Sequence, residues 1–184
     1  MIDSKALSKT VARVIVAVTG LPPESVSVVQ NFSAPKGSYC VIRLQNPLLW
    51  GQAMKTQREV VATDDPQYMD IIDQTRTQFD LSFSVNFYRD RAMDYAAALS
   101  EANKREPIKS ILRSNRMGWI RTSPANNLTG LYSGNQEERS QLDIHLYYED
   151  LVEDRVNRIY RVEYAVENEN QIVLTQGQVN GLSG

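Results

Sequence analysis

The chain has 184 residues, of which 42 % are hydrophobic and 23 % are charged, a composition typical of a globular protein with one sizeable core. Its formal net charge of −2 gives no general attraction to nucleic acid or to an anionic membrane. No run approaches the roughly 18 apolar residues of a membrane span, no cleavable signal pattern is present, and the single cysteine, Cys40, excludes a disulfide framework, so we expect folding in the cytoplasm.

The first predicted element is a helix. Apolar residues recur at helical spacing between positions 2 and 18. Asp3 or Ser4 can cap its start, and Gly20 supplies a stop at its end. The sequence therefore predicts one amphipathic helix before the first strands.

Short strands and loops follow this helix. Residues 26–30 and 39–44 are predicted strands, separated by a loop at residues 33–38 that contains Pro and Gly. Residues 46–51 are predicted to form a second loop. That loop carries an apolar cluster that we expect to be exposed: Leu48, Leu49 and Trp50.

A long alternating stretch at residues 75–88 is the clearest strand in the sequence. Its apolar side holds Phe79, Leu81, Phe83, Val85 and Phe87, for which a place in the core is favoured over a place in an interface. At about 3.3 Å per residue the stretch reaches roughly 45 Å, against about 5–6 residues for a usual strand. Part of it should therefore project beyond the core, with residues 55–63 as its partner in a β-hairpin arm.

Two helices and another strand are predicted next. Asp90 is a suitable N-cap for an alanine-rich helix at residues 92–99, and Pro107 fits the first turn of a third, short helix. Residues 119–121 are a predicted strand. Residues 123–134, rich in Ser, Pro, Asn and Gly, are predicted to form a long loop.

In the last third of the sequence, alternating apolar residues predict two more strands, at residues 142–148 and 160–166. An acidic turn at residues 149–154 is predicted to join them. The sum is a single α+β domain over residues 1–167, with a mainly antiparallel sheet covered by helices on one face. Residues 168–184 are expected to be a C-terminal tail, or an arm that adds a strand to another subunit.

The charges are unevenly distributed along the chain. Residues 104–121 contain six basic side chains and one acidic side chain, whereas residues 137–169 contain ten acidic and four basic side chains. These segments are either solvated surface or complementary faces that meet between copies.

No residue pattern indicates an enzyme. His145 is the sole histidine and lies on the polar side of its strand, and Cys40 alternates within an apolar strand as a small hydrophobic residue does. We therefore predict no catalytic, cofactor-binding or metal-binding residue. The basic residues from Arg113 to Arg121 around Trp119 are a weak nucleic-acid-binding pattern, which leaves a monomeric nucleic-acid-binding domain as an alternative.

Several segments recur in a recognisable order along the chain. They are residues 31–35 with the strand from Tyr39, residues 78–88 leading into Ala92–Asp94, the group Ile111, Leu112, Asn115 and Gly118, residues 138–143, residues 149–154 and residues 160–166. In their order and spacing, the chain resembles the phage neck (tail) terminator family between Ser4 and Val166. One departure is Arg89, at a position after the long strand where the family usually has glycine.

The resemblance implies a tail-terminator-like fold and a six-membered ring that caps the tail tube and ends its polymerisation. Its implied partners are other copies of the chain, the tail tube protein, the sheath protein if the tail contracts, and the head–tail connector or adaptor proteins. Phage DNA would pass through the lumen without sequence-specific binding. The implied location is the virion neck, after folding in the host bacterial cytoplasm, with no membrane partner and no cofactor. A cap subunit of a headless contractile injection particle is the alternative assembly.

We expect contacts between subunits to use the exposed apolar cluster and charged residues of the strands and short helix. These candidate interface residues are Leu48, Leu49, Trp50, Arg58, Arg76, Arg89, Arg113, Arg116, Glu149, Asp150, Glu153 and Asp154.

Overall fold

The computed structural model describes residues 3–28, 33–45, 47–63, 66–132, 135–156, 161–167 and 173–180. The chain forms two compact units. The first comprises Met1–Ala53 and Arg76–Asp150, and the second comprises Met54–Thr75 and Leu151–Gly184. Parts of several predicted segments lie outside the described residues, namely positions 2, 29–32, 46, 64–65, 133–134, 160, 168–172 and 181–184.

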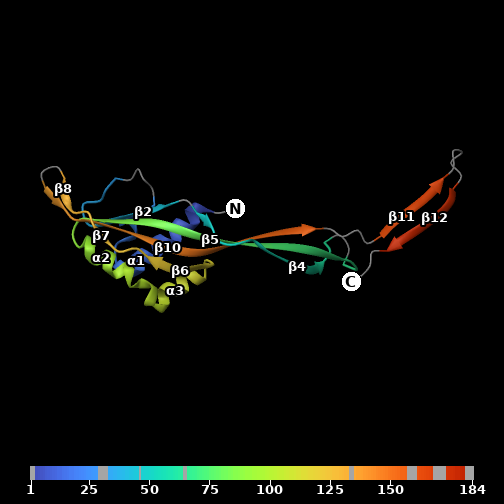
Figure 1. Cartoon of the computed structure of the whole chain (residues 1–184), viewed down its shortest axis with the longest axis horizontal. Helices are drawn as coiled ribbons and strands as arrows, with labels where there is room; N and C mark the ends of the chain where they lie inside the picture. The colour runs from blue at the N-terminus through green and yellow to red at the C-terminus, as the bar shows by residue number, and fades with distance from the viewer. Residues whose placement is uncertain are drawn as a thin grey trace. The chain divides into compact units, whose positions relative to one another are not determined.

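The first unit is built on a mixed sheet in the strand order β1, β2, β5, β10, β6 (Figure 1). β1 and β2 are parallel, whereas β2 with β5 and β10 with β6 are antiparallel. The predicted, mainly antiparallel α+β sheet is confirmed, with one parallel pair at its edge. The strands are β1 (Val26–Ser27), β2 (Tyr39–Leu44), β5 (Met69–Tyr88), β6 (Met117–Thr122) and β10 (Arg139–Val156).

Three helices, α1 (Ser4–Thr19), α2 (Ala92–Ser100) and α3 (Glu106–Arg113), lie together on one face of this sheet (Figure 1). Asp3 caps α1, because its carboxylate accepts hydrogen bonds from two backbone amides of the first turn at 3.0 Å each. Gly20 ends α1 with a φ of 71°, which glycine adopts without strain. None of the helices in the described ranges is long and apolar enough to cross a membrane.

The core lies between these helices and the apolar side of β5 and β10. Leu81, Phe83, Val85 and Phe87 are each 0 % exposed, so their predicted place in the core is confirmed. Phe79 is partly buried at the border of the same cluster. On β10 the even-numbered positions from 142 to 146 are buried beside them, namely Leu142, Ile144 and Leu146. One face of each strand is therefore apolar and covered, and the other is polar.

The predicted hairpin arm is present in the second unit. β4 (Met54–Val61) pairs with β5, and the side-chain amide of Gln57 donates to Asp73 at 2.8 Å. The turn between the strands is closed by a hydrogen bond from the Ala62 amide to the Tyr68 carbonyl at 2.9 Å. Nearly all of β4 is exposed, as expected for a strand beyond the core.

The prediction of an acidic turn at residues 149–154 is wrong, because β10 continues as a strand to Val156. Side chains of this stretch have partners on the neighbouring strands, and Arg58 lies 3.7 Å from the Glu153 carboxylate. Glu153 accepts a hydrogen bond from Gln74 at 2.8 Å, and the next basic residue, Arg155, donates to Asp70 at 2.9 Å. Cross-strand partners of opposite charge favour an extended backbone over a turn.

Two predicted loops contain strands. Residues 48–49 form β3 (Leu48–Leu49), which pairs antiparallel with β5. The loop at residues 123–134 contains β7 (Asn126–Asn127), which pairs with β10, and β8 (Gly130–Tyr132), which pairs with β9 (Asn135–Glu137). Short segments can gain backbone hydrogen bonds to a neighbouring strand that their composition does not reveal.

Asp90 is not the N-cap of α2. Arg91 occupies that position with a left-handed φ of 67°, and its side chain makes no capping hydrogen bond. A cap at Asp90 would start the helix at residue 91, but α2 starts at Ala92. The start is shifted because the preceding turn has left-handed conformations at both Arg89 and Arg91.

The last strands form a hairpin of their own. β11 (Arg161–Glu167) pairs antiparallel with β12 (Val173–Asn180). Residues 173–180 of the predicted tail are therefore a strand paired within this chain. The predicted strand at residues 160–166 is confirmed over its described part.

Truncation of Phe83 tests the core. Because Phe83 is 0 % exposed, we expect Phe83→Ala to lower the free energy of unfolding by about 3–5 kcal/mol in urea denaturation. Leu48→Ala is the matched control, since Leu48 is 63 % exposed and should change stability by less than about 0.5 kcal/mol. Equal effects of the two substitutions would contradict this assignment of the core.

Candidate functional site

Among the described residues of the first unit, Leu48–Trp50 is the most exposed apolar segment. The two leucines are each 63 % exposed and Trp50 is 49 % exposed. The segment is held against β5, with Leu48 opposite Asp80 and the Trp50 amide donating to the Gln78 carbonyl at 2.8 Å. The expected exposure is confirmed, and the segment is part of the sheet rather than a loose loop.

Trp50 also contacts β10 on the polar side of the sheet. Its ring meets the Tyr147 ring edge-on, with centroids 6.4 Å apart. Tyr147 alternates with the buried Leu146, so this contact lies on the face opposite the helices. An aromatic residue fixed in place beside two exposed leucines is the kind of surface that anchors protein–protein contacts.

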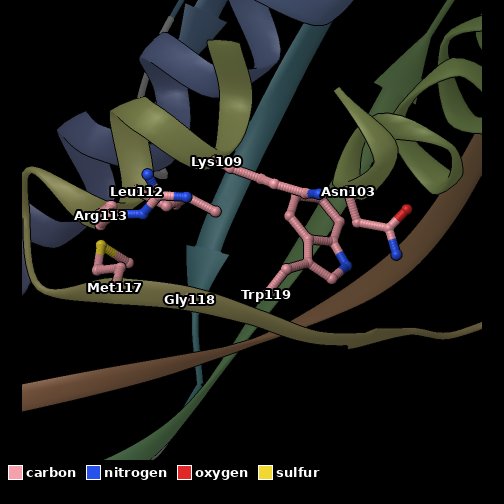
Figure 2. A pocket seen from close by; sticks show the side chains of 7 residues that line it. All are labelled: Asn103, Lys109, Leu112, Arg113, Met117, Gly118 and Trp119. Carbon is pink, nitrogen blue, oxygen red and sulfur yellow. The ribbon is translucent and has the colours of Figure 1, made fainter. Parts of the chain in front are cut away.

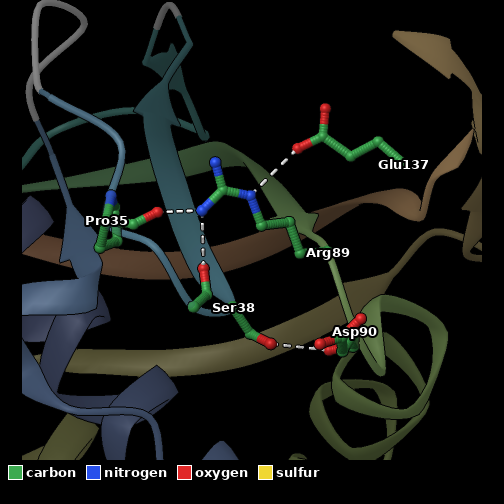
Figure 3. Close-up of polar contacts among 6 residues, drawn as sticks. Pro35, Ser38, Arg89, Asp90 and Glu137 are labelled. Carbon is green, nitrogen blue, oxygen red and sulfur yellow. Dashed lines mark hydrogen bonds and ion pairs between the residues drawn. The ribbon is translucent and has the colours of Figure 1, made fainter. Parts of the chain in front are cut away.

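The turn after β5 is organised by Arg89. Its φ of 66° is left-handed, a conformation that favours glycine. The guanidinium donates to the carbonyls of Pro35 and Gly37, the latter at 3.2 Å, and lies 3.4 Å from the Glu137 carboxylate (Figure 3). The side chain therefore ties the loop before β2 to the end of β9.

Two further contacts fix this turn. The Arg89 guanidinium lies 5.2 Å from the centroid of the Tyr39 ring, and the hydroxyl of Ser38 donates to the Asp90 carbonyl at 2.8 Å (Figure 3). Burial and the nearby Glu137 carboxylate raise the pKa of the Tyr39 hydroxyl. Arg89, predicted as an interface residue, thus has an internal structural role, and the expected turn is reached without glycine.

A pocket of about 280 Å³ lies between α3 and β6. Figure 2 shows α3 side chains on one wall and Met117 and Trp119 on the β6 wall. Lys109 and Arg113 make the rim basic, whereas the buried Leu112 and Met117 make the floor apolar. Arg113 is 3.4 Å from Glu106, and both side chains are about 70 % exposed, so this ion pair is weak.

Arg116 lies just beyond α3 and joins it to β10. Its φ is 54°, and its carbonyl accepts a hydrogen bond from the Glu149 amide at 3.1 Å. Glu149 accepts a hydrogen bond from the Tyr147 hydroxyl at 3.4 Å. Burial raises the pKa of Tyr148, and the charge of Asp150 adds to this rise. Arg116, Glu149 and Asp150 therefore lie at one end of the β6–β10 pair.

In the second unit, charged residues contact one another across the strands. Arg58 on β4 lies 3.7 Å from Glu153 on β10. Asp70, which is 5 % exposed, is held by Arg155, whose guanidinium also donates to the Val61 carbonyl at 2.6 Å. Of the predicted interface residues, the structure brings Arg58 and Glu153 together as an ion pair within the chain.

Polar side chains of β5 and β10 contact one another, and these contacts were not predicted from the sequence. His145 lies 3.1 Å from Asp80, Gln141 donates to Ser84 at 3.1 Å, and Arg139 donates to Asn86 at 3.1 Å. The only signal in the sequence was that these residues share the polar sides of two alternating strands; their register was not visible. His145, expected on a polar surface, is one partner in this set.

The described residues hold no group of three or more His, Cys, Asp or Glu side chains placed to bind a metal ion. Cys40 is buried, and burial raises the pKa of its thiol well above the usual value, which disfavours the reactive thiolate. The surfaces described above are suited to binding other macromolecules through apolar and charged side chains.

Comparison with known proteins gives one family. The family model described as phage neck terminator protein matches residues 5–171, which is most of the chain. No curated protein matches the chain.

Trp50→Ala tests the apolar segment. We expect the substitution to shift the protein toward smaller species in sedimentation velocity while lowering the melting temperature little, because Trp50 is 49 % exposed. Leu128→Ala, at a residue 43 % exposed elsewhere on the first unit, is the control and should leave the size distribution unchanged. Unchanged oligomer size with a large loss of melting temperature would count against a contact role.

Substitutions at Arg89 test the left-handed turn. Both Arg89→Ala and Arg89→Gly lose the guanidinium contacts, but alanine also keeps the unfavourable backbone, which costs about 1 kcal/mol relative to glycine. Urea unfolding should therefore rank the alanine variant below the glycine variant.

Arg91 provides the matched control for that comparison. It shares the left-handed φ, but its side chain is 68 % exposed, so Arg91→Gly should keep or raise stability. Equal stability of the two Arg89 variants would show that backbone conformation does not limit this turn.

Proposed function

Because the chain belongs to the phage neck terminator family, we propose that it forms a ring on the head-proximal end of a phage tail tube, stops tube growth and joins the tail to the head connector. Membership of this family makes the chain a structural protein of the phage neck and tail, located in the virion neck and acting with other phage proteins. The family match is the observation that carries this proposal.

The mechanism we propose is geometric. A ring that matches the tube on one face and differs from it on the other accepts no further tube subunits, so polymerisation ends without a chemical step. We take six copies as the ring size, in line with the resemblance noted from the sequence. Tube protein would bind one face of the ring and the connector or adaptor proteins the other, with sheath protein as a further partner in a contractile tail.

Two features of the described residues support an assembly role. The apolar segment Leu48–Trp50 is exposed but fixed to the sheet by β5, which lowers the entropy lost when it is buried by a partner. The nearly fully exposed β4 presents a strand edge, and such edges pair readily with other chains unless an assembly covers them. Phage DNA would pass through the lumen of the ring without sequence-specific binding, and the net charge of −2 gives the chain no general attraction to it.

Negative-stain imaging of the purified protein, alone and mixed with tail tubes from the same source, tests this function. We expect rings, or tubes capped at one end only, because a terminator recognises one end of a polar tube. Tubes pre-mixed with Trp50→Ala should be capped less often at equal protein concentration.

A protein that stays monomeric and leaves tubes uncapped would contradict the proposal. Salt-dependent DNA binding by such a monomer would support the nucleic-acid-binding alternative, to which the basic rim around Lys109 and Arg113 points.

A further inference from the structure

β6 is the last strand of the first unit's sheet. It pairs with β10 on one side, from Met117 opposite Tyr148 to Thr122 opposite Ile144. Across the described ranges, no strand pairs with its other side. An unpaired strand edge is a template on which an extended segment of another chain can add through backbone hydrogen bonds.

Three residues of this last strand, Met117, Gly118 and Trp119, line the pocket between α3 and β6. Its volume of about 280 Å³ is just below the roughly 300–1,000 Å³ of small-molecule sites, so it suits an inserted side chain better than a ligand. Lys109 and Arg113 select for an acidic group at the rim, and Leu112 with Met117 selects for an apolar side chain below it. An added strand that carries both an acidic and an apolar side chain on the same face, two residues apart, would satisfy both.

Such a segment occurs in β10 of the same chain. Val152, Asp154 and Val156 lie on one face of the strand because they alternate, and all three are exposed, the valines at 39 % and 45 %. β6 reaches only as far as Tyr148 along this strand, so no described strand pairs with the corresponding side of β10 beyond that residue. Within the described ranges, both strand edges therefore lack a paired strand.

The segment is already held in the extended conformation that strand addition needs. On its opposite face, Glu153 accepts a hydrogen bond from Gln74 at 2.8 Å, and Arg155 donates to Asp70 at 2.9 Å. The side chains of Val152, Asp154 and Val156 lie on the other face of the strand, away from these contacts. Little conformational entropy would be lost on docking.

We propose that residues 152–156 of a second copy of this chain add to the outer edge of β6. Asp154 of the second copy lies at the basic rim formed by Lys109 and Arg113, and one of its two valines enters the pocket over Leu112 and Met117. This contact rests on the proposed function and names the surfaces that join neighbouring subunits. Because the two surfaces differ, the contact is head-to-tail, the type that closes copies into a ring.

A charge exchange tests the pairing. Lys109→Glu and Asp154→Lys should each weaken self-association at least tenfold in sedimentation equilibrium and reduce tube capping in parallel. The double variant, which restores opposite charges across the contact, should recover most of the loss. Lys104→Glu and Glu24→Lys are matched controls at exposed positions outside the pocket and the segment, and should have little effect.

Single variants that assemble like wild type, or a double variant no better than the singles, would overturn the contact while ring formation by wild type still supports the proposed function. A Lys109→Glu variant that loses only DNA binding, with assembly intact, would assign the basic rim to nucleic acid and also overturn it.

Zero-length carbodiimide coupling gives a readout that does not require rings. An equal mixture of ¹⁴N- and ¹⁵N-labelled wild-type protein, concentrated and coupled, should yield a mixed-isotope crosslink between Lys109 and Asp154. Lys109→Arg keeps the charge but removes the coupling amine, so it should assemble normally and lose the crosslink.

The crosslink separates the two proposals. Its presence in protein that forms no rings and caps no tubes would support the contact and count against the terminator function. Its absence in concentrated or assembled wild-type protein would overturn the contact.

Discussion

Pairing between β5 and β10 is the constraint on which the rest of this structure depends. These strands hold 20 and 18 residues, and each contributes residues to both compact units. In the first unit their apolar sides meet the helices, while Asp80 with His145 and Asn86 with Arg139 set the register on the polar side. A slip of one residue would move every core side chain to the solvent face, so this register is strongly specified.

The other side of β5 is covered in succession by β2, β3 and β4. Leu44 lies opposite Phe83, and Leu48 lies opposite Asp80. The chain between β2 and β3 therefore advances by one residue more than β5 does over the same span. The extra residue marks an irregularity in the ladder, and such bulges redirect the side chains that follow. The exposed leucines and Trp50 come directly after it. The same long strand thus supplies the core and fixes the most exposed apolar surface.

The sequence predicted the features that depend on side-chain period and failed where backbone pairing or turn geometry decided. Alternation identified β5 and its buried residues from Leu81 to Phe87, and helical spacing with Gly20 identified α1. The acidic stretch of β10 was predicted to be a turn because the residues that contact it across the strands are distant in sequence. Gln74 and Arg58 contact Glu153, and Asp70 accepts a hydrogen bond from Arg155. At α2, two arginines in left-handed conformations replaced the expected Asp90 cap, and no local signal distinguishes them from ordinary surface residues.

The candidate surfaces were only partly predictable from the sequence. The exposure of Leu48–Trp50 followed from composition, whereas the pocket at β6 could be found only once the fold was known.

A cryo-EM reconstruction of the neck of a phage particle that carries this chain is the most direct measurement of the central claim. We expect a closed ring of copies at the head-proximal end of the tail tube, in contact with tube protein on one side and connector protein on the other. Density for the chain at another position in the particle, or as isolated copies that do not contact one another, would contradict it.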